Sequence, residues 1–130
     1  MSAEQAFFDA CREWRRITVA AGRAIHRRNW NFLHECQGFT QKLRPQVTRL
    51  AREARAEWKQ SGADLAKKEK QIRVVVVELK ELGERNVAWL QAARQAAQAE
   101  RERLEQAGQN LKRVQQSYAS TRPAAWTSLS

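Results

Sequence analysis

Apolar side chains recur along most of this chain at alternating steps of three and four residues, with polar side chains between them. This spacing returns side chains to one face of an α-helix at every turn. It therefore predicts long amphipathic helices that pack along a shared apolar seam, as in a coiled coil. In the first part of the chain the seam positions are Phe7, Cys11, Trp14, Thr18, Ala21, Ile25, Leu33, Cys36, Thr40, Leu43, Val47, Leu50 and Ala54.

The same repeat returns after residue 64 and runs farther than before. Its positions are Leu65, Lys68, Ile72, Val75, Leu79, Leu82, Asn86, Trp89, Ala93, Ala96, Glu100, Leu104, Ala107, Leu111, Val114 and Tyr118. From residue 119 the repeat is lost. We predict a helix over about 64–118 and a flexible C-terminal tail over 119–130, because a chain end with no periodic apolar face is poorly held.

Helix start and stop signals divide the rest of the chain. Ser2 followed by Gln5 forms the capping-box pattern that opens a helix. Gly62 suits the residue after a helix end, and Asp64 suits the cap of the next helix. We therefore predict further helices over about 3–28 and 30–61. The chain holds only five glycines and two prolines, too few for the many turns of a β-sandwich or barrel.

Two all-α arrangements fit these helices. In the first, which we expect, residues 1–118 form one domain, a long antiparallel hairpin that turns near residue 62. Near Asn29 and near Glu100, successive steps of four residues interrupt the alternation of three and four. In a hairpin these two interruptions would lie at nearly the same level of the two arms. In the alternative, the first arm breaks near residue 29, with Asn29 as an N-cap, and gives a three-helix bundle. Pro45 is a further expected kink in the first arm.

The net charge of the chain indicates which classes of partner it could bind. The chain has 24 Lys and Arg against 14 Asp and Glu, a net charge of +10. Such an excess favours nucleic acid, acidic membrane surfaces or acidic proteins. The excess is spread along the chain, with 12 basic and 6 acidic residues through residue 60. The densest basic patch lies on the first predicted helix: Arg12, Arg15, Arg16, Arg23, Arg27 and Arg28. It is either a solvated face or a contact for an acidic partner.

The chain offers no constellation for catalysis. It has no glycine-rich phosphate loop, and His26 and His34 are eight residues apart, which does not match a metal-binding helix pattern. Cys11 and Cys36 lie on the seam, where reduced buried thiols are expected. We predict no enzymatic activity, no cofactor and no metal. No apolar run is long enough to span a membrane and the N-terminus is polar, so we expect a cytoplasmic protein.

The tryptophans fall into two groups. Trp14, Trp58 and Trp89 lie on or beside the seam, so we expect them to pack in the core. Trp30 lies off the seam and Trp126 lies in the predicted tail. Exposed tryptophan is common in protein interfaces, and we predict that these two side chains contact a partner.

Two segments resemble the FlgN-type flagellar export chaperones. The stretch 24–33, Ala-Ile-His-Arg-Arg-Asn-Trp-Asn-Phe-Leu, is similar to a family segment in which Asp usually stands at the place of Asn29. The stretch 81–90, Glu-Leu-Gly-Glu-Arg-Asn-Val-Ala-Trp-Leu, is similar to a paired-Asn segment of that family. Here Gly83 replaces the first Asn and Val87 a Gly. A long helix rich in Gln and Leu and ending at Tyr118 follows, as in the family.

The resemblance implies a cytoplasmic chaperone that covers the amphipathic terminal helices of hook–filament junction proteins before their export, preventing premature assembly. We expect the client helix to lie along the seam of the last predicted helix. The expected contacts there are Leu104, Leu111, Val114 and Tyr118. The same seam could pair with a second copy of the chain. Two other functions fit the residues: a basic coiled-coil stalk of the export ATPase apparatus, of the FliJ type, and a helical nucleic-acid-binding adaptor.

Overall fold

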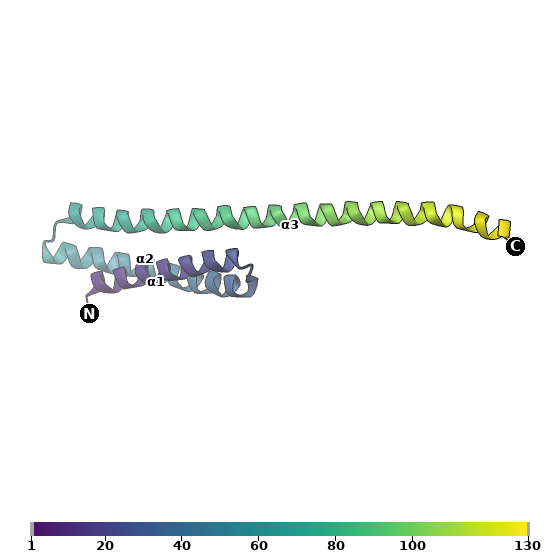
Figure 1. Cartoon of the computed structure of the whole chain (residues 1–130). Coiled ribbons are helices and arrows are strands. Elements are labelled where there is room, and N and C mark those ends of the chain that lie inside the picture. Colours follow the sequence, from purple (N-terminus) through teal and green to yellow (C-terminus); the bar gives the residue numbers. More distant parts are fainter. Residues whose placement is uncertain (1, 130) are drawn as a thin grey trace. The chain divides into compact units, whose positions relative to one another are not determined.

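The computed structural model of the chain contains three helices: α1 (Ala3–His26), α2 (Trp30–Ser61) and α3 (Leu65–Leu129) (Figure 1). It describes the backbone of residues 2–129 and the side chains of residues 2–119. Over that part of the chain there is no strand, so the predicted all-α class is confirmed. The chain divides into two units, Met1–Gln91 and Ala92–Ser130. The predicted domain limits, 1–118 and 119–130, stay predictions.

Side chains cap the helices where the sequence indicates. Ser2 has extended backbone angles, and its side chain accepts a hydrogen bond from the backbone N–H of Gln5. This bond satisfies one of the N–H groups that the first turn of a helix leaves without a partner. Asn29 caps α2 in the same way through the N–H of Phe32, at 3.1 Å. Gly62 ends α2 in the left-handed conformation, with φ of 70°.

The first arm of the chain is broken at Asn29, as in the three-helix alternative. Helix α1 ends at His26, and Arg28 takes a positive φ of 54° before Asn29 starts α2. A left-handed residue followed by a cap reverses the chain within three residues, which a continuous arm would not permit. Pro45 lies inside α2, and the helix continues past it. Unit 1 is therefore a bundle of α1, α2 and the part of α3 up to residue 91.

A packed cluster joins the three helices of unit 1 near the α2–α3 turn. Its buried members are Phe7 and Cys11 of α1, Ala54 and Trp58 of α2, and Ile72 of α3. Phe7 is 1% exposed and Ala54 is fully buried. Burying one large apolar side chain contributes about 1.5–3 kcal/mol. These seam residues therefore stabilise the bundle, as the heptad spacing predicts.

Polar contacts fix the relative positions of the helices in unit 1. The carboxylate of Glu57 in α2 accepts a hydrogen bond from the N–H of Ala3 at 2.8 Å. Lys68 of α3 pairs with Glu4 of α1 at 2.5 Å. Because Lys68–Glu4 and Ala3–Glu57 tie the start of α1 to both other helices, the bundle is closed at this end. In the part of the chain that the structure describes, no helix has an apolar stretch sufficient to cross a membrane.

Candidate functional site

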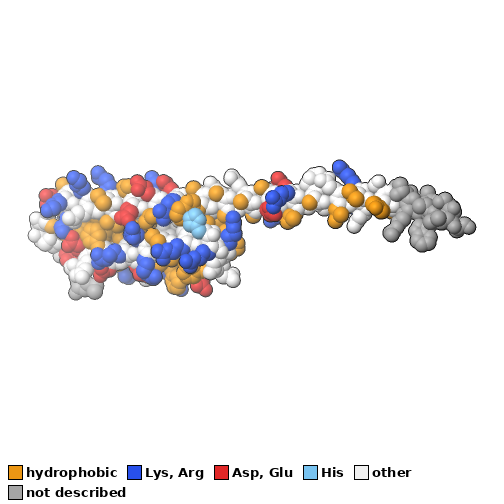
Figure 2. All heavy atoms as spheres, viewed as in Figure 1, with side chains coloured by type: hydrophobic (Ala, Val, Ile, Leu, Met, Phe, Trp, Pro, Cys, Tyr) orange, Lys and Arg blue, Asp and Glu red, His pale blue; other side chains and the backbone are white. Residues whose placement is uncertain are grey.

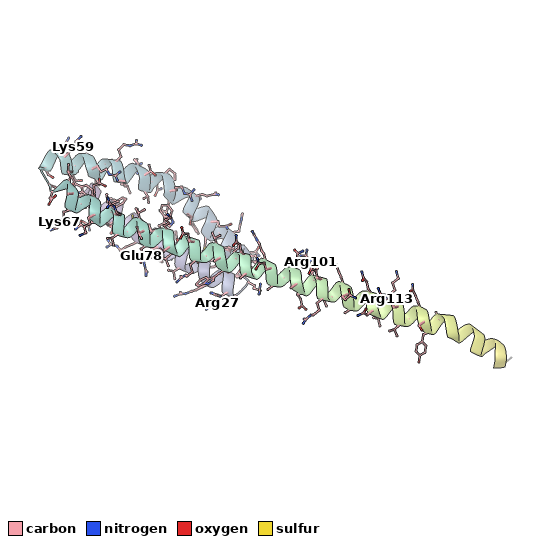
Figure 3. The ribbon with its side chains drawn as sticks, turned by 90° about the horizontal axis from the view of Figure 1, so that it is seen from above. Arg27, Lys59, Lys67, Glu78, Arg101 and Arg113 are labelled. Carbon is pink, nitrogen blue, oxygen red and sulfur yellow. The ribbon has the colours of Figure 1, made fainter. Side chains whose placement is uncertain are left out.

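From residue 94 on, the described part of unit 2 is a helix whose apolar side chains are open to solvent. Every side chain from residue 94 to residue 119 is exposed. Figure 3 shows side chains projecting from all sides of this helix around the labelled Arg101 and Arg113. We call four predicted contact residues the C-terminal stripe: Leu104, Leu111, Val114 and Tyr118, which are 63%, 59%, 57% and 68% exposed.

The stripe occupies one face of the helix. At 100° per residue its four members fall within about a quarter of the helix circumference, whereas Gln109 and Gln116 lie on the opposite face. Short-range polar pairs support the helix itself, including Arg103 with Glu100 and Gln106 with Asn110. Such pairs are worth only a few tenths of a kcal/mol each, roughly 0.2–0.5. An apolar stripe of this kind is typical of a helix that pairs with another helix.

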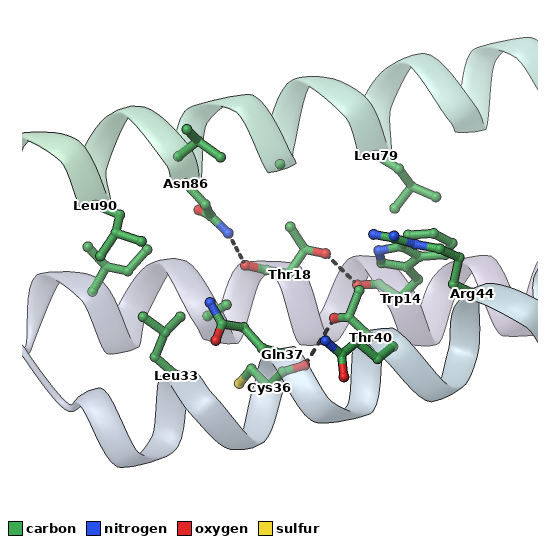
Figure 4. A pocket seen from close by; sticks show the side chains of 15 residues that line it. Trp14, Thr18, Leu33, Cys36, Gln37, Thr40, Arg44, Leu79, Asn86 and Leu90 are labelled. Carbon is green, nitrogen blue, oxygen red and sulfur yellow. Dashed lines mark hydrogen bonds between the residues drawn. The ribbon is translucent and has the colours of Figure 1, made fainter.

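A second candidate site is an open groove in unit 1, which we call the waist groove. It has a volume of about 580 Å³ and lies between α3 and the α1–α2 pair (Figure 4). It begins beside the packed cluster, at Trp14 and Leu79, and ends at Leu33 and Leu90. Between these large residues the lining is small or polar: Thr18, Ala21, Cys36, Gln37, Thr40 and Gly83.

Two glycines show where the helices touch and where they stand apart. A Cβ atom on Gly22 of α1 would lie 2.8 Å from Asn86 Oδ1 and 2.9 Å from Trp89 Cζ3 of α3. A Cβ on Gly83 of α3 would meet no other atom within 4 Å. Helix α1 and helix α3 are therefore in close contact at Gly22, one end of the waist groove, and the groove itself is hollow at Gly83.

Asn86 links the two walls of this hollow. Its side-chain N–H₂ donates to the backbone carbonyl of Thr18 at 2.8 Å, while its Oδ1 is buried with no donor among the described residues. The hydroxyl of Thr18 donates to the carbonyl of Trp14 within α1. Among the residues that line the groove, the polar side chains are uncharged except that of Arg44, at the end beside Trp14.

The structure divides the predicted basic patch into two parts. Arg12 and Arg16 pair with Asp9 and Glu13 one turn earlier, and Arg15 pairs with Glu78 of α3 at 2.5 Å. The hydrogen bond from Arg16 also lowers the pKa of Glu13. The other three residues, Arg23, Arg27 and Arg28, are exposed and have no carboxylate partner among the described residues. In Figure 2, basic side chains are spread over the visible face of unit 1 among hydrophobic and acidic ones.

Among the tryptophans whose side chains the structure describes, Trp58 lies in the core as predicted, whereas Trp14 and Trp89 are only partly covered. Trp58 is 3% exposed, Trp14 and Trp89 are half-buried, and Trp30 is 45% exposed. Trp89 packs against His26 at 4.2 Å between ring centroids, and the guanidinium of Arg85 lies 4.4 Å from the Trp89 ring. Trp126 and the predicted tail from residue 120 on lie outside the residues whose side chains the structure describes.

The cysteines are buried and unpaired, as expected from their seam positions. Burial raises the pKa of the Cys11 thiol to about 11. It also raises the pKa of Cys36. Across residues 2–119 no group of three or more His, Cys, Asp and Glu side chains is placed to hold a metal ion.

Sequence reasoning missed several exposed apolar residues and the waist groove. Phe32 and Phe39 of α2 are 40% and 53% exposed, and Val74 of α3 is 63% exposed. All three lie off the seam, and that position was the available signal for their exposure. The signal for the groove was the run of small seam residues, Thr18 and Ala21, facing a glycine at residue 83.

No protein-family model, no curated protein and no solved structure matches this chain.

Proposed function

We propose that this protein is a non-enzymatic helix-binding protein that holds an amphipathic helix of a partner along the C-terminal stripe. The exposure of Leu104, Leu111 and Val114 on one face of a long helix carries the proposal. Helix-in-groove and helix-on-helix recognition use apolar anchors at this spacing. Leu104, Leu111 and Val114 expose more than half of their side-chain surface, so a partner can bury apolar area on this face.

The energetic scale fits reversible capture. Full burial of one Leu or Val side chain is worth about 1.5–3 kcal/mol. Because the stripe residues are 57–68% exposed, their burial supplies less than the roughly 6–12 kcal/mol expected for four fully exposed side chains. The association cost is about 4–15 kcal/mol, which the partner's own apolar residues help to offset. The complex is then one that forms and dissociates, as a carrier of other proteins requires.

An export chaperone is the specific form of this function that we propose. It would act in the cytoplasm on the amphipathic terminal helices of flagellar hook–filament junction proteins. The support is the resemblance to FlgN-type chaperones at residues 24–33 and 81–90, followed by the long last helix. The first of these segments contains the α1–α2 turn with its Asn29 cap, and the second lines the waist groove through Gly83, Asn86, Val87 and Leu90.

Site-specific photocrosslinking tests the proposal. A photoreactive phenylalanine analogue replaces Leu111 on the stripe, and in a matched variant it replaces Gln109 on the opposite face. Expressed in the cell of origin, the Leu111 variant should crosslink one defined protein, and the Gln109 variant should not. A flagellar junction protein in the adduct supports the chaperone; a hexameric ATPase supports the stalk alternative. Equal crosslinking from both positions would contradict helix binding at the stripe.

Binding of a nucleic acid is a second candidate function, favoured by Arg23, Arg27 and Arg28 without carboxylate partners. Phosphate contacts release counterions, so such binding weakens steeply between about 50 and 200 mM salt. Apolar helix capture is much less sensitive to salt. Pull-down of the tagged protein at about 0.1 and 0.5 M salt, with and without nuclease, therefore separates the two functions.

A further inference from the structure

The waist groove leaves the middle of unit 1 open to solvent between α3 and the α1–α2 pair. Packed helices usually fill the space between them, and an open groove leaves the atoms that line it without the contacts that close packing would supply. Here the seam carries Thr18, Ala21 and Gly83 at the level of the waist groove, where leucines would fill the space. The packed cluster lies at one end of this groove, and the Gly22 contact between α1 and α3 lies at the other.

The lining of the groove matches the chemistry of a peptide. Ile25, Leu33 and Leu90 offer apolar surface at one end. Gln37, Gln41 and Thr40 offer uncharged donors and acceptors along α2, which suit the N–H and C=O groups of a peptide backbone. A volume of about 580 Å³ lies within the range of binding clefts and has room for a few residues.

One charged residue, the exposed Arg44, lies at an end of the groove and favours an anionic group there. Among the described residues that line the groove, Arg44 is the only charged one. Figure 4 places it with Trp14 at the end under Leu79. Its guanidinium has no carboxylate partner among the described residues. A guanidinium binds a carboxylate through two parallel charge-assisted hydrogen bonds.

We propose that the waist groove binds the C-terminal end of a partner polypeptide. The terminal carboxylate pairs with Arg44, the last apolar side chains fill the hollow over Gly83, and the glutamines of α2 bond the peptide groups. This site is in unit 1 and is separate from the C-terminal stripe. It holds whether or not the stripe captures a helix.

The first test uses short peptides in matched pairs. Each peptide has a flexible Gly-Ser lead and ends in Leu-Leu, Leu-Phe or Val-Leu, once with a free carboxylate and once as the C-terminal amide. Calorimetric titration should show at least one free acid binding about tenfold more tightly than its amide, the effect of one charge-assisted contact. Equal affinity of acid and amide, or no binding by any free acid, would overturn the proposal.

Two pairs of variants locate the binding. Arg44→Gln should reduce the affinity of the acid peptide to that of the amide, and Arg52→Gln, which removes a charge from α2 outside the groove, should leave it unchanged. Gly83→Leu should fill the hollow and abolish binding, while Gly83→Ala should retain it; both changes raise helix propensity, and only Leu occupies the space. Melting curves check that all four variants are folded. Binding that survives both Arg44→Gln and Gly83→Leu would sink the assignment.

Discussion

Leu33 and Leu111 are the same residue type, and each lies on the heptad seam of its own helix. Leu33 is 8% exposed, whereas Leu111 is 59% exposed. Leu33 belongs to unit 1, where three helices share their seams. Leu111 belongs to unit 2, whose described side chains from residue 94 on are all exposed. The heptad spacing states which face of a helix is apolar, and the surroundings decide what covers that face. The seam in unit 1 is thus buried when the three helices pack together, and the seam in unit 2 is exposed from residue 94 to residue 119.

The largest expected effect compares these two leucines directly. Leu33→Ala should lower the free energy of unfolding by about 2–5 kcal/mol, because it leaves a cavity among buried side chains. Leu111→Ala should change it by no more than about 0.5 kcal/mol, as surface substitutions do. Chemical denaturation followed by circular dichroism measures both values. A cost at Leu111 near that at Leu33 would mean that the stripe is already buried, for instance in a dimer, and that cost would then depend on protein concentration.

Much of the fold was accessible from the sequence because the signals are local. Ser2, Asn29 and Gly62 are capping residues, and each is found at a helix end. The choice between a hairpin and a bundle was not accessible in this way. It depends on the reversal at Arg28, which takes a left-handed conformation. Residues other than glycine rarely have a positive φ, so an arginine at this position does not predict one.

The candidate sites were accessible to different degrees. The C-terminal stripe follows from heptad spacing alone, so its residues were predicted, and their exposure required the structure. The waist groove depends on the distance between α3 and the other helices. Small residues such as Ala21 and Gly83 leave space there, but they do not determine that distance. Arg44 is one of six arginines and lysines in α2, and only the packing of three helices marks it as the charged residue of the groove.

The next largest effect concerns the pH dependence of the free energy of unfolding, which differs between a buried thiol and a solvated one. Burial raises the pKa of Cys11 from 9.0 to about 11 in the folded state. Between these pH values the unfolded chain loses the thiol proton and the folded chain retains it, so stability falls as pH rises. At about 1.4 kcal/mol per pKa unit the loss is roughly 2–3 kcal/mol. Cys11→Ala should remove this part of the pH dependence, and an unchanged slope between pH 9 and 11 would contradict the buried thiol.

Glycine substitutions compare close packing in unit 1 with open space in unit 2. Gly22→Ala should destabilise the protein by roughly 1 kcal/mol, since the new methyl meets Asn86 and Trp89 and outweighs the gain in helix propensity. Gly108→Ala meets no atom within 4 Å and should stabilise the helix by up to about 1 kcal/mol. Thermal melts followed by circular dichroism at about 222 nm, where helices absorb, report both changes in stability. Opposite signs are expected; stabilisation by both would show that α1 and α3 are not in contact at Gly22.

The smallest expected effect tests how the packed cluster tolerates a polar atom. The Nε1–H of Trp58 is buried with no acceptor among the described residues, whereas the polar side chains of unit 2 from residue 94 to 119 are exposed to water. Trp58→Phe removes this unsatisfied donor, which is worth about 1–3 kcal/mol, and it leaves a smaller side chain, which costs a similar amount. The net change in unfolding free energy should therefore stay within about 1 kcal/mol of zero. A cost well above that value in urea denaturation would mean that a water molecule bonds the indole N–H in solution, because the substitution would then lose a satisfied hydrogen bond as well as volume.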